Sequence, residues 1–132
     1  MTMRHMLAVA LVMFAQGCSM NSGLIIKNST RASICIQTQI ESVVVDPGLD
    51  SRRVAIGNAS SFSINESSEG RVMQYELPRP FGHLAERRKV SFQTLYLDLD
   101  ESDAIYVRDS TDHHRIVPQP QRFPIKPASI RN

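Results

Sequence analysis

Apolar and polar residues alternate along much of the chain, with the period of two that is typical of β-strands with one buried face. Segment 33–40 shows this most clearly, because Ile34, Ile36 and Ile40 would share one face of a strand. Segment 90–99 is instead apolar on both faces, as expected of a central strand that is covered from both sides. The pattern predicts strands in residues 24–28, 33–40, 43–45, 53–56, 61–64, 71–77, 90–99, 104–108 and 115–117.

Turn-prone residues separate these runs and leave room for little helix. In Asp46-Pro47-Gly48 the proline presets φ for the second position of a turn, and the glycine accepts the positive φ of the third. Residues 83–89 have room for one helical turn. Many short strands joined by tight turns predict an all-β fold: a small antiparallel β-sandwich of about 7–9 strands, immunoglobulin-like or transthyretin-like in shape.

The first eighteen residues follow a different pattern. Arg4 precedes a nine-residue apolar run at residues 6–14, and the small residues Ala15 and Gly17 stand just before Cys18. A basic start, a short apolar run and a small-x-small ending are together the layout of an export signal. The run is far shorter than the roughly 20 residues that cross a bilayer as a helix, so we interpret it as a removable address.

This segment resembles the signal peptide of bacterial lipoproteins, which is cut just before a cysteine that receives a diacylglyceryl group. The resemblance implies that residues 1–17 are removed and that Cys18 becomes the lipidated N-terminus. Ser19 stands where an Asp would favour the inner membrane, so the resemblance also implies the outer membrane, facing the periplasm. The alternative is ordinary secretory cleavage after Gly17, which would leave Cys18 available for a disulfide with Cys35.

The mature chain is expected to divide into a lipidated tether (18–23), one β-sandwich domain (24–117) and a tail (118–132). Small polar residues favour the tether, and a chain of this length can form one domain without disulfides. Four of the seven prolines follow residue 117, and the cations after the last acid, Asp112, have no acidic neighbours in sequence. These features predict a basic, extended, polyproline-like tail.

Charge and motif content argue against several functions. The formal net charge of +2 falls by one when Arg4 is removed, and a nearly neutral domain is a poor binder of nucleic acid. There is no Gly-x-Ser-x-Gly elbow, and Cys35 lacks a local catalytic signature. We therefore expect no catalytic residue, no enzyme activity, no cofactor and no nucleic-acid partner.

Two clusters invite a metal hypothesis. His113 and His114 are adjacent, but neighbouring side chains on a strand point to opposite faces, which favours a solvated polar loop over a metal site. The acidic run 98–103 lacks the glycine and the final glutamate of a calcium-binding loop, so we interpret it as a charged hairpin turn. No metal site is predicted.

Together these features favour a non-catalytic, lipid-anchored component of a cell-envelope complex, such as a secretion system or a pilus. Membrane lipid would hold Cys18, and protein partners would bind the tail, because a preformed extended segment loses little entropy on docking. The candidate partner-binding residues are Arg122, Phe123, Lys126 and Arg131. The alternative function is a periplasmic inhibitor or small-ligand-binding lipoprotein, which needs a concave pocket. The basic triplet 87–89 is a solvated loop or a contact for lipid head groups or an acidic partner.

Overall fold

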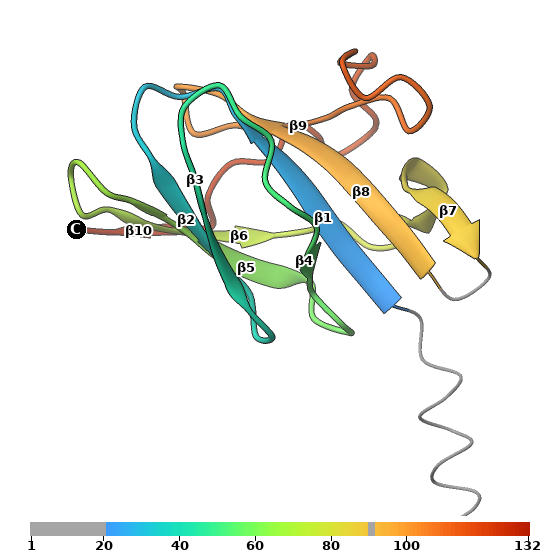
Figure 1. The fold of residues 1–132 in the computed structure, drawn as a ribbon, viewed down its shortest axis with the longest axis horizontal. Coiled ribbons are helices and arrows are strands. Elements are labelled where there is room, and N and C mark those ends of the chain that lie inside the picture. The colour runs from blue at the N-terminus through green and yellow to red at the C-terminus, as the bar shows by residue number, and fades with distance from the viewer. Residues whose placement is uncertain (1–20, 90–91) are drawn as a thin grey trace, which may run out of the picture.

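A computed structural model describes residues 21–89 and 92–132, so the predicted signal peptide and Cys18 lie outside the described residues. Two five-stranded sheets pack face to face as a β-sandwich (Figure 1), which confirms the all-β prediction. The first sheet contains β4 (Val54–Ala55), β1 (Asn21–Asn28), β8 (Phe92–Leu99), β7 (Glu86–Lys89) and β9 (Ile105–Val107). The second contains β10 (Ser129–Arg131), β6 (Val72–Glu76), β5 (Ser61–Glu66), β2 (Ile34–Gln37) and β3 (Ser42–Val45).

Strand β8 is the centre of the first sheet, as its apolar composition predicted. On one side β1 pairs with it along its whole length, from Asn21 opposite Phe92 to Asn28 opposite Leu99. On the other side β7 pairs with its first half and β9 with its second half. The β1–β8 pair is parallel, so the prediction of a purely antiparallel sandwich is wrong for this sheet. A parallel pair requires a crossover, which the rest of the sandwich supplies here.

The core lies between the sheets and follows the alternation of the sequence. Leu24 and Ile26 of β1 and the leucines of β8 face inward and are fully buried. Met73, Tyr75 and Leu77 are buried in the opposite sheet, as their alignment predicted. The Tyr75 ring stacks on Phe62 with ring centroids 5.5 Å apart, and its hydroxyl donates to the Asp103 carbonyl at 2.9 Å.

The outer face of β8 is covered as well, by the segment after β9. Arg108, only 2% exposed, donates to the carbonyls of Ile25 and His113 and pairs with Asp50 at 2.8 Å. The His113 ring stacks on Tyr96 with centroids 3.4 Å apart. This polar cluster explains how a strand buried on both faces carries Tyr96 on its outer side, where both His113 and Arg108 contact the ring.

The predicted tether is shorter than expected, because β1 begins at Asn21 and not at Leu24. Ser22 is buried, and its hydroxyl accepts a hydrogen bond from the Gln93 amide at 2.8 Å. Gly23 lets Arg53 cross the strand at close range: a Cβ at this position would lie 2.5 Å from the Arg53 Cζ. Asn21, Ser22 and Gly23, which the sequence assigned to the tether, are therefore part of the sheet.

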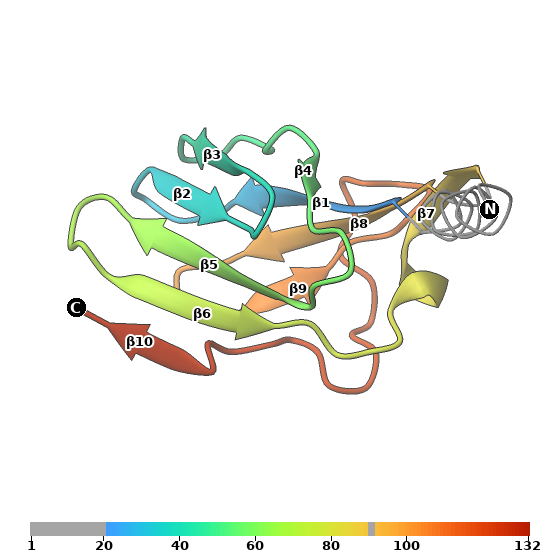
Figure 2. The ribbon, with the colours of Figure 1, turned by 90° about the horizontal axis from the view of Figure 1, so that it is seen from below.

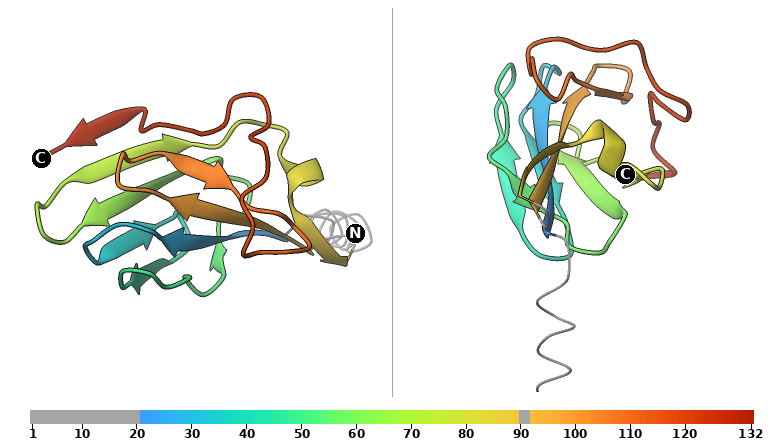
Figure 3. Two further views of the ribbon diagram at one scale, coloured as in Figure 1. Left: turned by 90° about the horizontal axis from the view of Figure 1, so that it is seen from above. Right: turned by 90° about the vertical axis from the view of Figure 1, so that its right-hand side faces the viewer.

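The predicted domain boundary at residue 117 is also wrong, since residues 118–132 pack into the domain and do not form a separate tail. Phe123 and Ile125 are 9% and 6% exposed and belong to the hydrophobic core. The Gln119 side chain makes hydrogen bonds with both the N–H and the C=O of Val107. The segment ends as β10, antiparallel to β6 (Figures 2 and 3). The prolines prevent a continuous strand but leave the side chains free to fill the core.

Four smaller predictions need correction. Ile40 is 58% exposed, because β2 ends at Gln37 and the Thr38 hydroxyl accepts the N–H of Ile40 in a turn. Residues 115–117 form only an isolated bridge between Ile116 and Arg108. Of segment 83–89, only its first two residues are helical, in η1 (Gly82–Leu84), and its last four form β7. The basic triplet therefore lies on an edge strand and not in a loop.

Candidate partner-binding site

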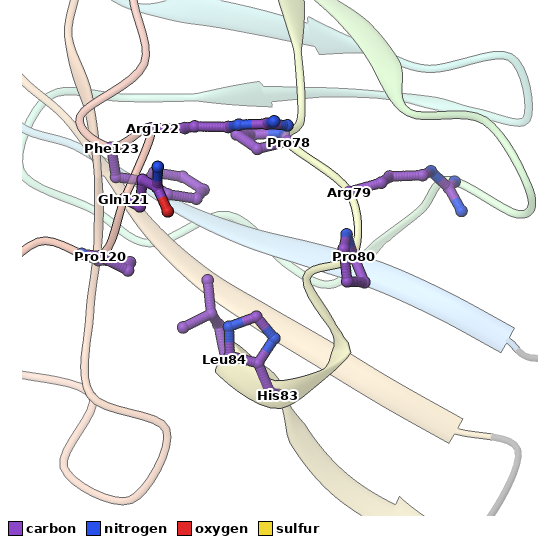
Figure 4. A pocket seen from close by; sticks show the side chains of 9 residues that line it. All are labelled: Pro78, Arg79, Pro80, His83, Leu84, Pro120, Gln121, Arg122 and Phe123. Carbon is purple, nitrogen blue, oxygen red and sulfur yellow. The ribbon is translucent and has the colours of Figure 1, made fainter.

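A groove opens where the link from β6 to η1 passes the segment before β10 (Figure 4). Its volume is about 270 Å³. Both walls are rich in proline, and cationic or polar side chains stand among the apolar ones (Figure 4). The lining residues are Pro78, Arg79, Pro80, His83, Leu84, Pro120, Gln121, Arg122 and Phe123.

One wall is fixed by the residues that follow β6. The Leu77 N–H donates to the Ser60 carbonyl at 2.8 Å, and the Leu77 side chain is buried, so the chain leaves β6 in a set direction. Arg79 donates to the carbonyls of Asn58 and Ala59 at 2.8 and 2.9 Å. Its guanidinium also lies 5.4 Å from the centroid of the buried Phe81 ring.

The other wall is the turn 120–123. The Phe123 N–H donates to the Pro120 carbonyl at 3.0 Å. Arg122 has φ of 73°, in the left-handed region that glycine normally occupies. Such backbone strain concentrates at functional sites, which favours a role for the exposed Arg122 side chain. The Phe123 side chain fills the core below, so the turn is anchored to the domain.

The groove has the chemistry of a binding surface. Its nine lining residues supply no carboxylate, hydroxyl or thiol, and His83 is the one imidazole among them. Prolines lose little conformational entropy on binding, and arginine forms bidentate hydrogen bonds with carboxylates. These residues suit a short extended segment that carries an acidic side chain.

The structure separates the four predicted partner-binding residues. Arg122 and Phe123 line the groove together with Arg79 and His83, which the sequence did not single out. Lys126 lies elsewhere and donates to the Ser102 carbonyl at 3.0 Å. Arg131 lies at the end of β10 and borders a shallow polar groove with Gln37, Ser63 and Gln74, among others. Cys18, the predicted lipidation site, lies outside the described residues.

A second charged cluster ties the β5–β6 hairpin to the turn after β8. Arg71 pairs with Glu66 at 2.6 Å and with Asp103 at 3.1 Å. The hydrogen bond from Arg71 lowers the pKa of Glu66, and the two carboxylates raise the pKa of Arg71. The side chain of Asp100 accepts the N–H groups of Ser102 and Ala104, which confirms the predicted hairpin turn. We interpret this cluster as structural, because its members satisfy one another.

The two adjacent histidines diverge. His113 lies half-buried on Tyr96, with Nε2 2.9 Å from a Glu86 carboxylate oxygen. His114 is exposed. Within residues 21–89 and 92–132, no three His, Cys, Asp or Glu side chains are placed to hold a metal ion together. Cys35 is a free, half-buried thiol on the outer face of β2, opposite Val44.

Within the part of the chain that the structure describes, no helix combines the length and apolar character that crossing a membrane requires. No family model, no curated protein and no solved structure matches this chain.

Proposed function

We propose that this chain is a lipid-anchored lipoprotein on the periplasmic side of the outer membrane, where it acts without catalysis as a binding component of a cell-envelope assembly. The observation that best supports this proposal is that β1 begins at Asn21, only three residues after the predicted lipidation site, Cys18. Three extended residues span at most about 11 Å. An acylated Cys18 would therefore hold the sandwich directly against the membrane surface.

The anchor itself follows from the chemistry of acylation. Each buried CH₂ group contributes about 0.8 kcal/mol, so two or three acyl chains hold a protein stably without a spanning helix. The groove between residues 78–84 and 120–123 is our candidate for the contact with the partner. Both its walls are rigidly attached to the core, which keeps the entropy cost of binding small.

The size of the groove favours a peptide-like partner over a small molecule. At about 270 Å³ it is smaller than the roughly 300–1,000 Å³ of typical ligand pockets. It can accept one or two side chains of a longer segment. The groove around Arg71 is larger, at about 400 Å³, but Arg71, Glu66 and Asp103 in its lining are engaged in ion pairs with one another. We therefore rank a small-ligand-binding lipoprotein below an assembly component.

Metabolic labelling with palmitate tests the anchor. We expect the label on the wild-type chain, loss of the label in Cys18→Ser, and full labelling in Cys35→Ser, which removes the other cysteine. The wild-type and Cys35→Ser proteins should sediment with outer-membrane fractions. Label that persists in Cys18→Ser would refute the assignment of the acceptor.

A photo-reactive amino acid at Gln121 tests the groove. Irradiation of cells should yield one discrete adduct, and Arg122→Glu should abolish it because the substitution reverses the charge at the rim. Arg131→Glu, the same charge reversal outside the groove, is the matched control and should leave the adduct intact. Equal losses in both variants would show that the effect is not local to the groove.

A further inference from the structure

The two ends of the sandwich differ in charge, and the end where β1 begins is basic. Asn21 of β1 lies opposite Phe92 of β8, and Phe92 lies opposite Lys89 of β7, so these three residues form one row across the sheet. The adjacent row places Arg87 opposite Gln93. The triplet Arg87-Arg88-Lys89 therefore occupies the same end of the molecule as the first described residue (Figure 2).

Arg53 adds a cation to this end. It lies flat over the Phe92 ring, with Cζ 3.9 Å from the centroid, and crosses the starts of β1 and β8. Its hydrogen bonds go to neutral acceptors: the Thr94 hydroxyl, the Gln93 carbonyl and the Asn21 carbonyl and side-chain oxygens. Among the described residues, the hydrogen bonds of the half-buried Arg53 thus go to neutral groups, and Glu41 acts on its charge only through space.

The opposite end carries an excess of acids. Glu66, Glu69, Glu101 and Asp103 gather there around Arg31 and Arg71. The β5–β6 hairpin, which supplies part of this cluster, lies at the end of the sandwich far from the start of β1 (Figure 2). The charge of the domain is thus polarised along its strands, with the positive end toward the predicted anchor.

We propose that this basic end, formed by Arg53, Arg87 and Phe92, rests on anionic lipid head groups. The inference rests on the proposed function, because lipidated Cys18 would place this end within about 11 Å of the membrane. Arginine and a half-exposed aromatic ring suit the membrane interface, where cations contact phosphates and the ring enters the boundary region. The acidic end would then face away from the membrane.

Vesicle binding without the anchor tests this surface. The chain from residue 18 to 132 with Cys18→Ser, which contains every described residue, is mixed with neutral vesicles or with vesicles containing about one-third phosphatidylglycerol. We expect binding to the anionic vesicles only. Each unit of positive charge near such a surface contributes roughly fivefold, so Arg87→Glu, which changes the charge by two units, should weaken binding about 20-fold.

Two further variants separate charge from folding and position. Arg87→Gln removes the charge without reversing it and should weaken binding only about fivefold. Arg31→Glu makes the matched reversal outside the basic end and should change binding less than about twofold. Equal binding to neutral and anionic vesicles, or equal losses in both reversed variants, would overturn the proposal.

The lipidated full chain gives an independent readout. In vesicles with anionic lipid, backbone amides of β7 and of the first residues of β8 should exchange with deuterium more slowly than in neutral vesicles; identical rates would contradict the proposal. The intact mass of the protein shows independently whether Cys18 is lipidated. A bare Cys18 with selective vesicle binding would refute only the anchor, and a lipidated Cys18 without such binding would refute only the basic surface.

Discussion

Truncating Phe123 tests whether residues 118–132 belong to the folded domain. The Phe123 side chain is 9% exposed and lies in the core cluster, so Phe123→Ala removes most of an aromatic ring from the interior. Such substitutions cost about 3–5 kcal/mol. We expect about 3 kcal/mol, at the lower end, because the ring also borders an open groove into which the structure can relax. A domain of this size is stable by about 5–15 kcal/mol, so the variant should still fold.

Urea unfolding followed by far-ultraviolet circular dichroism measures the effect. With an m-value of about 1.5 kcal/mol per molar urea, the unfolding midpoint should fall by about 2 M. The melting temperature should fall by about 12 °C, at roughly 4 °C per kcal/mol for a chain of this length. Deletion of residues 118–132 removes Phe123, Ile125 and β10 together and should abolish cooperative folding.

Ile130→Ala is the matched control from the same segment. Ile130 lies on β10 but is 49% exposed, so its truncation should cost about 0.5 kcal/mol or less. A Phe123→Ala midpoint equal to that of the wild type, or a deletion variant that unfolds cooperatively at the wild-type midpoint, would refute the integration of this segment into the core.

Three further predictions concern the interior and the charged end. The pKa of Glu66 is lowered in the folded state, so its contribution to stability is present above its unfolded pKa of about 4.3 and is lost as the pH falls through the folded value. Glu66→Gln should therefore lower the urea midpoint most at pH 7, and by progressively less as the pH falls below about 4.3. Asn28→Ala removes buried hydrogen bonds to the carbonyls of Ala32 and Val45 and should cost about 3 kcal/mol, whereas Asn65→Ala, whose Oδ1 has no partner, should cost little. Gly23→Ala should displace Arg53 from the sheet and cost about 1–3 kcal/mol in the same assay; an unchanged midpoint would show that Arg53 moves freely.

The alternation of apolar and polar residues predicted the strands whose two faces differ in burial. Met73, Tyr75 and Leu77 stand at every second position of the predicted strand 71–77, and all three are buried. Segment 90–99 was assigned a central place because both its faces are apolar, and β8 has neighbours on both sides. The local pattern of apolar and polar residues was sufficient to predict these strands, because the burial of each face determines which residues can stand on it.

The local sequence pattern could not predict how distant segments pair with each other. The parallel β1–β8 pair joins residues about seventy positions apart, and no short-range signal specifies it. β10 has three exposed residues and no alternation, so only its hydrogen bonds with β6 define it. The prolines of residues 118–127 indicated a tail, but Phe123 and Ile125 between them fill the core.

The candidate site could be predicted only in part, because it also brings together segments that are distant in sequence. Arg122 and Phe123 stood out as a cation and an aromatic residue in a proline-rich segment. Their partners across the groove, Arg79 and His83, lie about forty residues earlier. The proline pair at 78 and 80 was the available signal, since it interrupts a strand pattern and marks a rigid connection.

The intact mass of the protein extracted from membranes decides whether Cys18 carries lipid. We expect a chain that begins at Cys18 and carries the added mass of a diacylglyceryl group and an N-linked acyl chain. A mass that matches the unmodified chain, whether cut at Cys18 or elsewhere, would contradict the anchor and the membrane-facing orientation built on it.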